Sequence, residues 1–294
     1  MPLRESTFSL HRVTELPLDL GHPVYEHYTT FKLGVGASVG YYARLLVPLV
    51  KKAIADPCCR DWVLTAPPYD AVRAGANLLC EAVDVLLQGS LPTGFESRRI
   101  DIRHHPVDPH HPEINRPYRY SSVGWRERRQ SREYWHSLTI DEPRFTGRDV
   151  IFVNDINVTG AQRDAMRRYF AGLGAASVAW VYIIDVDEAI GRATPELEEA
   201  INTSTPLSVE QLAELTAGCG IRVTSQCLHR LLSLDEPDFK SLLTLVGKAS
   251  REELLRLVRA ESRYRAPQFA AKLGLLQRAC AHPRASPVAW RMRI

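Results

Sequence analysis

At 294 residues the chain has room for one large domain or for a core with an appended piece. Hydrophobic residues make up 45% and charged residues 24% of it, as in an ordinary soluble globular protein, and a net charge of +3 gives no overall field that would demand nucleic acid as a partner. No apolar run reaches 18 residues and the N-terminus is too polar for a signal peptide, so we expect no membrane span and a cytoplasmic protein. The six cysteines lack framework spacing, which predicts reduced thiols.

The N-terminal part carries few structural signals. Residues 1–30 contain three prolines and little periodicity, so we expect them to lie extended over the surface. Residues 27–33 (HYTTFKL) alternate as in a strand, and the glycine-rich stretch 34–40 predicts a turn into a helix at residues 41–54. The glycine spacing is not that of a dinucleotide-binding loop.

The first strand-to-helix unit is predicted further along the chain. The apolar run WVLTA at residues 62–66 ends in a polar loop, and a helix is expected from about residue 71 to 87. Residues 98–103 (RRIDIR) alternate like another strand. A loop at the carboxyl end of a parallel strand is where α/β proteins bind ligands, so the loop after residue 66 is a candidate binding loop.

Residues 104–137 form the most irregular part of the sequence. Six arginines with aromatic residues between them lie in this proline-containing segment, and a loop of such length is usually functional or disordered. One alternative is that the arginines and aromatic residues stack on single-stranded RNA. Another is a zinc site, but the spacing of the histidines gives no second pair of ligands, so solvated loop histidines are expected. These are His104, His105, His110 and His111.

The most informative stretch joins a buried strand to a helix. Residues 150–153 are an unbroken apolar run, which suits a strand covered on both faces. Two polar residues end the run, and Thr159 and Gly160 then begin a helix. A second apolar run at residues 177–184 completes a strand, helix, strand unit of a parallel sheet.

The loop of this unit predicts a site for a ribose 5-phosphate. Backbone N–H groups at a helix start favour an anion, so the phosphate is expected on the amides from Val158 to Gln162. The carboxylate of Asp155 would repel a phosphate but would accept hydrogen bonds from sugar hydroxyls. Asn154 and Asp155 are therefore expected to hold the ribose.

Residues 191–294 are predicted to be a helical extension. Several of the expected helices begin at Ser or Asp, and Ser250 with Glu253 has the spacing of a capping box. The expected helices are residues 195–201, 208–217, 225–232, 237–246 and 250–260.

The motif VIFVNDINVTGAQ at residues 150–162 resembles the phosphoribosyl-pyrophosphate (PRPP) motif of the type I phosphoribosyltransferases. That motif has a hydrophobic strand, two acidic residues, three variable positions and then Thr-Gly. Here Asn154 stands where the first acid is usual, and Gln162 stands where Thr or Ser is usual. FKLGVG at residues 31–36 is also similar to the amino-terminal segment of a phosphoribosyltransferase-like group from bacterial stress-response (tellurite-resistance) operons. The resemblance covers roughly residues 30–190.

The resemblance implies an α/β fold with a mostly parallel sheet flanked by helices over residues 31–190. It also implies a mobile hood over the active site at residues 104–137. The implied reaction transfers the 5-phosphoribosyl group of PRPP to a small-molecule acceptor, such as a nucleobase-like compound, with release of pyrophosphate. Mg²⁺ is expected to bind through PRPP, with no residue assigned to the metal directly. The extension is expected to cap the acceptor site or to form a homodimer.

Roles for individual residues also follow from the resemblance. Asp155 and Asn154 are expected at the reacting ribose, where Asp155 would help to stabilise positive charge. The remaining contacts are Val158, Thr159, Gly160, Ala161 and Gln162 for the 5-phosphate, Tyr69, Asp70, Arg73 and Arg103 for pyrophosphate, and Tyr120, Ser121 and Arg126 in the hood.

Two other functions stay open at this point. Because Asn154 replaces an acid, the protein is also interpreted as a PRPP-binding sensor or regulator that works without turnover. An RNA-associated protein that uses the arginine-rich segment is less favoured, since the rest of the chain is not basic.

Residues 104–137 give a prediction that needs only the sequence. Their arginines have few local acidic partners and their prolines oppose regular structure. We therefore expect a protease to cut the free protein there and PRPP with Mg²⁺ to protect it, as measured by limited proteolysis. Cleavage that the ligand leaves unchanged would count against the hood.

Overall fold

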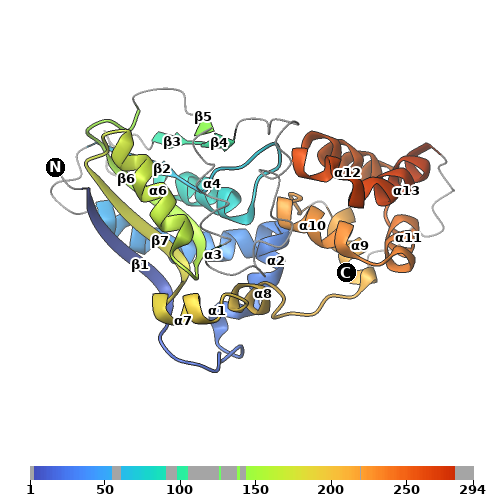
Figure 1. The fold of residues 1–294 in the computed structure, drawn as a ribbon, viewed down its shortest axis with the longest axis horizontal. Helices are drawn as coiled ribbons and strands as arrows, with labels where there is room; N and C mark the ends of the chain where they lie inside the picture. The colour runs from blue at the N-terminus through green and yellow to red at the C-terminus, as the bar shows by residue number, and fades with distance from the viewer. Residues whose placement is uncertain are drawn as a thin grey trace.

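The computed structural model describes residues 3–54, 61–90, 98–104, 126, 138–139, 144–218 and 220–281. Two parts lie side by side along the molecule, a sheet flanked by helices and a group of C-terminal helices (Figure 1). These two parts are called the α/β part and the C-terminal extension below. They meet at a border where both contribute side chains to the same cavities.

Five parallel strands form the sheet of the α/β part, in the order β1-β7-β6-β2-β3. This confirms the predicted α/β fold with a parallel sheet flanked by helices. The strands are β1 (Arg4–Val13), β2 (Trp62–Thr65), β3 (Arg98–Ile100), β6 (Asp149–Asn157) and β7 (Ser177–Val186). The helices of this part are α1 (Pro23–Glu26), α2 (Tyr28–Leu33), α3 (Gly36–Ile54), α4 (Gly75–Gln88), α6 (Ala161–Gly172), α7 (Glu188–Ala193) and α8 (Leu197–Asn202).

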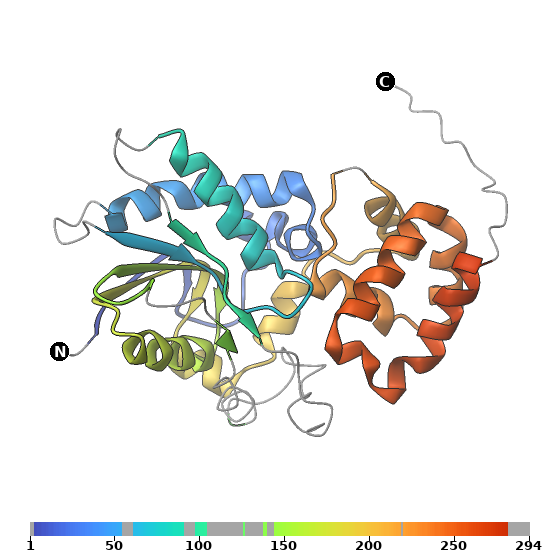
Figure 2. The ribbon, with the colours of Figure 1, turned by 90° about the horizontal axis from the view of Figure 1, so that it is seen from above.

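Helices cover both faces of the sheet, with α3 and α4 on one side and α6 on the other (Figure 2). The central strand β6 is buried along its whole length because its side chains alternate between two cores. Ile151 and Val153 belong to the core under α3 and α4. Phe152 faces the other way and packs edge-on against Phe170 of α6 and Trp180 of β7. The unbroken apolar run thus reflects a strand covered on both faces, as predicted.

The N-terminal residues form a strand, although they were expected to lie over the surface. β1 pairs in parallel with β7, from Arg4 opposite Ser177 to Val13 opposite Val186. β1 is an edge strand of the sheet, with a strand neighbour on one side only, and its first eight residues are exposed or partly buried. Its sequence therefore needs no continuous apolar run, and this is why the pattern did not reveal it.

The strand expected at residues 27–33 is wrong, because this segment contains helix α2. Tyr28 and Phe31 are three positions apart, and both rings are fully buried beside Tyr42 of α3. In a segment this short, the same apolar residues fit both the spacing of a helix and the alternation of a strand. The helix forms because it buries both rings on one side. α2 ends at Gly34, whose φ of 94° is left-handed.

Other boundaries differ from the sequence prediction in smaller ways. α3 begins at Gly36 rather than at residue 41. α4 begins at Gly75 rather than at residue 71, because the side chain of Asn77 accepts a hydrogen bond from the Ala74 N–H at 2.8 Å. The strand expected at residues 98–103 divides after Ile100. Its end, β4 (Arg103–His104), pairs instead in antiparallel fashion with β5 (Leu138–Thr139).

The C-terminal extension has a hydrophobic core of its own. Leu33 of α2 and Val72 of the β2–α4 loop join that core, so the extension packs directly on these two segments. The capping box predicted at Ser250 is wrong, since the helix begins at Lys248 and Ser250 lies inside its first turn. The helices are α9 (Val209–Ala217), α10 (Ser225–Ser233), α11 (Glu236–Leu245), α12 (Lys248–Ala260) and α13 (Ala270–Ala281), with 3-10 turns at Ser262–Arg265 and Pro267–Phe269. None of the helices described is long and apolar enough to cross a membrane.

A side chain at Gly34 should disturb the border between the two parts. An added Cβ would lie 2.0 Å from the backbone oxygen of Arg222, and the left-handed φ disfavours any residue with a Cβ. We expect Gly34→Ala to lower the free energy of unfolding by about 2 to 4 kcal/mol, as measured by urea denaturation. The matched control is Gly172→Ala at the end of α6, where nothing lies within 4 Å and where we expect no loss. Equal stability of the Gly34 variant and the parent would contradict the prediction.

Candidate functional site

The loop between β6 and α6 is the first part of the site. β6 continues to Asn157, so Asn154 and Asp155 lie within the strand. The sequence pattern instead predicts that these two polar residues end the strand. Gly160 has a φ of 73° and is the N-cap of α6. The amides of the first helical turn lack acceptors within the helix, and the positive end of the helix dipole lies there. This loop therefore has the backbone arrangement that binds anions.

A cavity of about 210 Å³ lies at this loop and is called the loop cavity below. All the residues predicted for the ribose and the 5-phosphate line it, namely Asn154, Asp155, Val158, Thr159, Gly160, Ala161 and Gln162. The β2–α4 loop contributes Tyr69 and Val72 to the same lining. The structure thus brings the predicted ribose and phosphate residues together with one member, Tyr69, of the predicted pyrophosphate group.

Residues that the sequence analysis did not single out also line the loop cavity. Lys32 comes from α2, and Ser225, Gln226 and Arg263 come from the C-terminal extension. Lys32 lies in the FKLGVG stretch, and this is the one signal that pointed toward it. The three residues of the extension belong to no sequence motif. They reach this loop only because the extension packs against it.

Lys32 forms a buried ion pair with Asp155 in the cavity wall. The ammonium of Lys32 donates to Oδ2 of Asp155, and both side chains are less than one tenth exposed. The hydroxyl of Tyr28 donates to the same oxygen over 3.2 Å. Burial, and then the nearby charge of Asp155, raises the pKa of Tyr28 well above its usual value, so this hydroxyl keeps its proton. Neither contact uses Oδ1 of Asp155.

The two residues that depart from the PRPP motif contact each other. The side-chain amide of Asn154 donates to Oε1 of Gln162 over 3.0 Å and to the backbone oxygen of Ile156 over 3.0 Å. An acid at position 154 would have no proton to give to the Ile156 oxygen at neutral pH. The two departures are therefore one local arrangement that ties the end of β6 to the first turn of α6.

Asp70 and Arg103, both predicted for pyrophosphate, do not line the loop cavity. Oδ2 of Asp70 accepts hydrogen bonds from the backbone N–H and the hydroxyl of Ser262, at 2.9 and 2.6 Å. The guanidinium of Arg103 lies over the ring of Tyr69, 4.5 Å from its centre, and donates to the backbone oxygen of Asp70 at 3.4 Å. Both side chains thus contact neighbouring residues, and neither lines the cavity at the anion loop.

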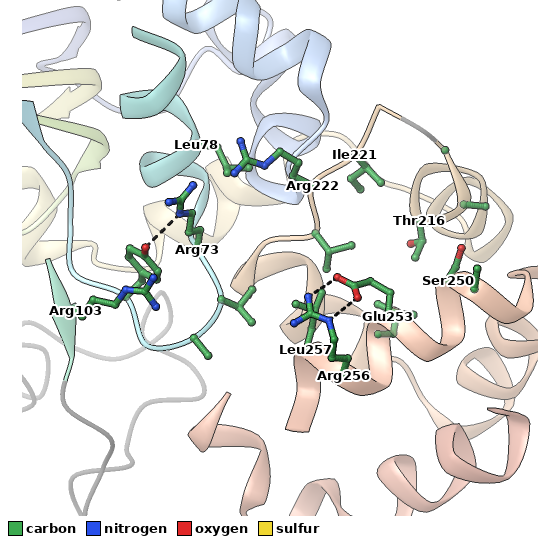
Figure 3. Close-up of a pocket in the computed structure, with 18 residues that line it drawn as sticks. Arg73, Leu78, Arg103, Thr216, Ile221, Arg222, Ser250, Glu253, Arg256 and Leu257 are labelled. Atoms are coloured by element: carbon green, nitrogen blue, oxygen red, sulfur yellow. Dashed lines mark hydrogen bonds and ion pairs between the residues drawn. The ribbon is translucent and has the colours of Figure 1, made fainter. Parts of the chain in front are cut away.

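Arg73 and Arg103 instead line a larger cavity of about 600 Å³ at the border of the two parts (Figure 3). On the extension side of this border cavity, Arg256 of α12 is paired with Glu253 at 2.7 Å. Tyr69 and Val72 line both cavities, so the β2–α4 loop is a wall that they share. Arg73 is balanced by two carboxylates, those of Glu81 and Asp101.

The predicted hood falls largely outside the described residues. Tyr120 and Ser121 lie outside them, and Arg126 is described only as an exposed residue. Their roles stay predictions from the sequence.

A family model described as PRTase ComF-like matches residues 110–276, which is more than half of the chain. The chain belongs to the PRTase ComF-like family. The family supports a protein of the phosphoribosyltransferase type and does not separate out the stress-response group. No curated protein matches the sequence.

The PRTase ComF-like match and the motif-based resemblance overlap at the loop cavity. The match begins at residue 110, so it leaves out β2, α4 and the loop between them, and it runs through α12 into α13. The motif-based resemblance ended near residue 190. Both contain the β6–α6 loop, and the family match also takes in Arg263 and the other residues of the extension that line the cavity.

The motif predicts that Asn154→Asp maintains or improves PRPP binding, whereas the contacts of the Asn154 side chain predict that the variant is less stable. In this structure the new carboxylate would face the Ile156 oxygen at about the distance of the present hydrogen bond, which raises its pKa. A carboxyl whose pKa is higher in the folded protein lowers the free energy of unfolding as the pH rises above its unfolded pKa of about 4. We expect the variant to be less stable than the parent by about 1 to 3 kcal/mol at pH 7.5 and by less at pH 4.5, as measured by denaturation at both values. A deficit that does not depend on pH would contradict this account.

Proposed function

We propose that this protein binds PRPP with Mg²⁺ and transfers its 5-phosphoribosyl group to a small-molecule acceptor. Membership of the PRTase ComF-like family supports phosphoribosyl transfer in general. The observation that carries the finer proposal is the loop cavity, in which the β6–α6 anion loop, the Asp155 carboxylate and the β2–α4 loop share one space.

The contents of the loop cavity suggest how the ligand would lie. The 5-phosphate would meet the first-turn amides of α6, and the ribose hydroxyls would donate to Oδ1 of Asp155, which neither Lys32 nor Tyr28 uses. The anomeric end would then point toward the β2–α4 loop. At about 210 Å³ the loop cavity is smaller than most ligand sites, which hold roughly 300 to 1,000 Å³. The acceptor is therefore expected outside the loop cavity, on the face of the ribose opposite the leaving pyrophosphate.

The described residues contain no group of three or more His, Cys, Asp or Glu side chains placed to hold a metal ion. A Mg²⁺ ion that arrives on phosphate oxygens of its ligand needs at most one or two carboxylates, and the loop cavity is lined by those of Asp155 and Glu198. Bound in this way, Mg²⁺ would neutralise charge on the leaving pyrophosphate.

In the proposed reaction the bond from C1 of the ribose to the pyrophosphate oxygen breaks, and the bonding electrons leave with pyrophosphate. A lone pair of the acceptor forms the new bond to C1, and the proton of the acceptor passes to water. The protein holds the two reactants in line and excludes water from C1. Because Lys32 balances Asp155, the pair adds little net negative charge to stabilise a positive ribose, so positioning carries most of the catalysis.

The same balance favours a second candidate function, a PRPP-binding sensor or regulator without turnover. The Lys32–Asp155 pair and the Asn154–Gln162 contact would position a bound ligand and the β6–α6 loop more than they would stabilise a transition state. Release of pyrophosphate from PRPP, measured with and without a panel of acceptors, separates the two functions. The acceptor, and with it any role in nucleotide metabolism or in a stress response, stays a prediction.

The ribose assignment can be tested by removing both charges of the buried pair. Asp155→Asn alone would leave Lys32 buried without a partner, so the test uses Lys32→Met with Asp155→Asn, which should keep most of the stability. We expect the double variant to bind Mg-PRPP about ten to a hundred times more weakly than the parent in calorimetric titration, because charge-assisted bonds to the hydroxyls are lost.

The matched control is Asp185→Asn. Asp185 is a buried carboxylate of β7 that accepts from Asn157 at 2.8 Å and does not line the loop cavity. It should change the affinity by less than about threefold, which corresponds to under 1 kcal/mol. A folded double variant that binds Mg-PRPP as tightly as the parent would overturn the ribose assignment.

A further inference from the structure

Glu261, at the end of α12, is a fully buried carboxylate that holds the β2–α4 loop. Its side chain has no exposed surface. Oε2 accepts a hydrogen bond from the backbone N–H of Val72 at 2.9 Å, and Oε1 accepts from Nε of Arg263 at 2.7 Å. Burying a carboxylate is expensive unless hydrogen bonds and an opposite charge compensate it, and here an amide and a guanidinium do so.

The two groups that hold Glu261 belong to residues of the loop cavity. Val72 and Arg263 both line it, together with the β6–α6 anion loop. A backbone N–H beside a guanidinium is an anion site, and in this structure a carboxylate of the chain itself occupies it. Glu261 itself does not line the loop cavity, so the position that its carboxylate occupies adjoins the cavity through Val72 and Arg263, beside the anion position at the start of α6.

The contacts around Glu261 attach the extension to this loop. Ser262, the next residue, donates its N–H and its hydroxyl to Asp70. The N–H of Ser225 donates to the backbone oxygen of Arg73 at 3.0 Å. The Glu261 carboxylate is thus the charged centre of a joint between the β2–α4 loop and the C-terminal extension.

We propose that the Glu261 carboxylate competes with the anionic group at the anomeric end of the ligand for the same two hydrogen-bond donors. A ligand diphosphate takes over the Val72 N–H and the Arg263 guanidinium, Glu261 leaves, and the joint between loop and extension opens. The identity of the ligand rests on the function proposed above, whereas the competition itself requires only a diphosphate group. A sugar with a single phosphate binds at α6 and leaves Glu261 in place.

The test measures binding of two probes, Mg-pyrophosphate and ribose 5-phosphate, to the parent and to Glu261→Gln. Gln can still accept from the Val72 N–H but no longer neutralises Arg263, so pyrophosphate should bind at least tenfold more tightly to the variant. Ribose 5-phosphate should bind equally to both within about threefold. The matched control is Glu252→Gln on the same helix, since Glu252 is exposed and paired with Lys248 at 3.6 Å. Unchanged or weaker pyrophosphate binding by folded Glu261→Gln overturns the proposal.

A second measurement uses the unaltered protein and does not depend on the folding of a variant. Mg-pyrophosphate should speed hydrogen exchange in the peptide that contains residues 261–265, because these residues leave the loop, and ribose 5-phosphate should not. Exchange that pyrophosphate leaves unchanged or slows at these residues overturns the competition. Failure of the parent to bind ribose 5-phosphate, with the pyrophosphate response intact, would instead remove the proposed function and leave Glu261 as a competitor for diphosphates.

Discussion

The buried ion pair between Lys32 and Asp155 is the contact on which the site depends. Its partners are 123 positions apart, and it joins helix α2 to the central strand of the sheet. The backbone oxygen of Lys32 also accepts a hydrogen bond from the hydroxyl of Thr224 at 2.6 Å, where α10 of the extension begins. One residue thus contacts the central strand through its side chain and the extension through its backbone. Such a pair, taken out of water, costs too much to be kept unless its geometry is well supported.

The pair also sets the electrostatics of the loop cavity. A lone carboxylate on the wall would repel a phosphorylated sugar, and Lys32 removes that repulsion while Oδ1 of Asp155 stays unused by either donor. In the proposed pose, the groups that would bind anions are the amides at the start of α6 and, once Glu261 is displaced, Arg263 with the Val72 N–H. In this pose, polar groups would make the contacts with the ligand, and little net charge would be directed at the ribose.

Both cavities lie where the extension meets the α/β part. The β2–α4 loop is their common wall, and the extension holds it through Glu261 and Ser262. Ligand sites often form at such borders because neither part alone encloses the space. A change in how the extension packs would therefore alter both cavities together.

The sequence by itself determined the β6–α6–β7 unit, since its signals are local: an apolar run buried on both faces, a Thr-Gly helix start and a second apolar run. It missed β1, because an edge strand needs no apolar run, and it took α2 for a strand, because six residues fit either period. Only the tertiary structure decided that Asp155 meets Lys32 and that Asp70 turns to Ser262. It also decided that Glu261 and Arg263 reach the loop. Such contacts join residues remote in sequence, and a charged residue shows no periodicity that names its partner, so packing alone selects the pair.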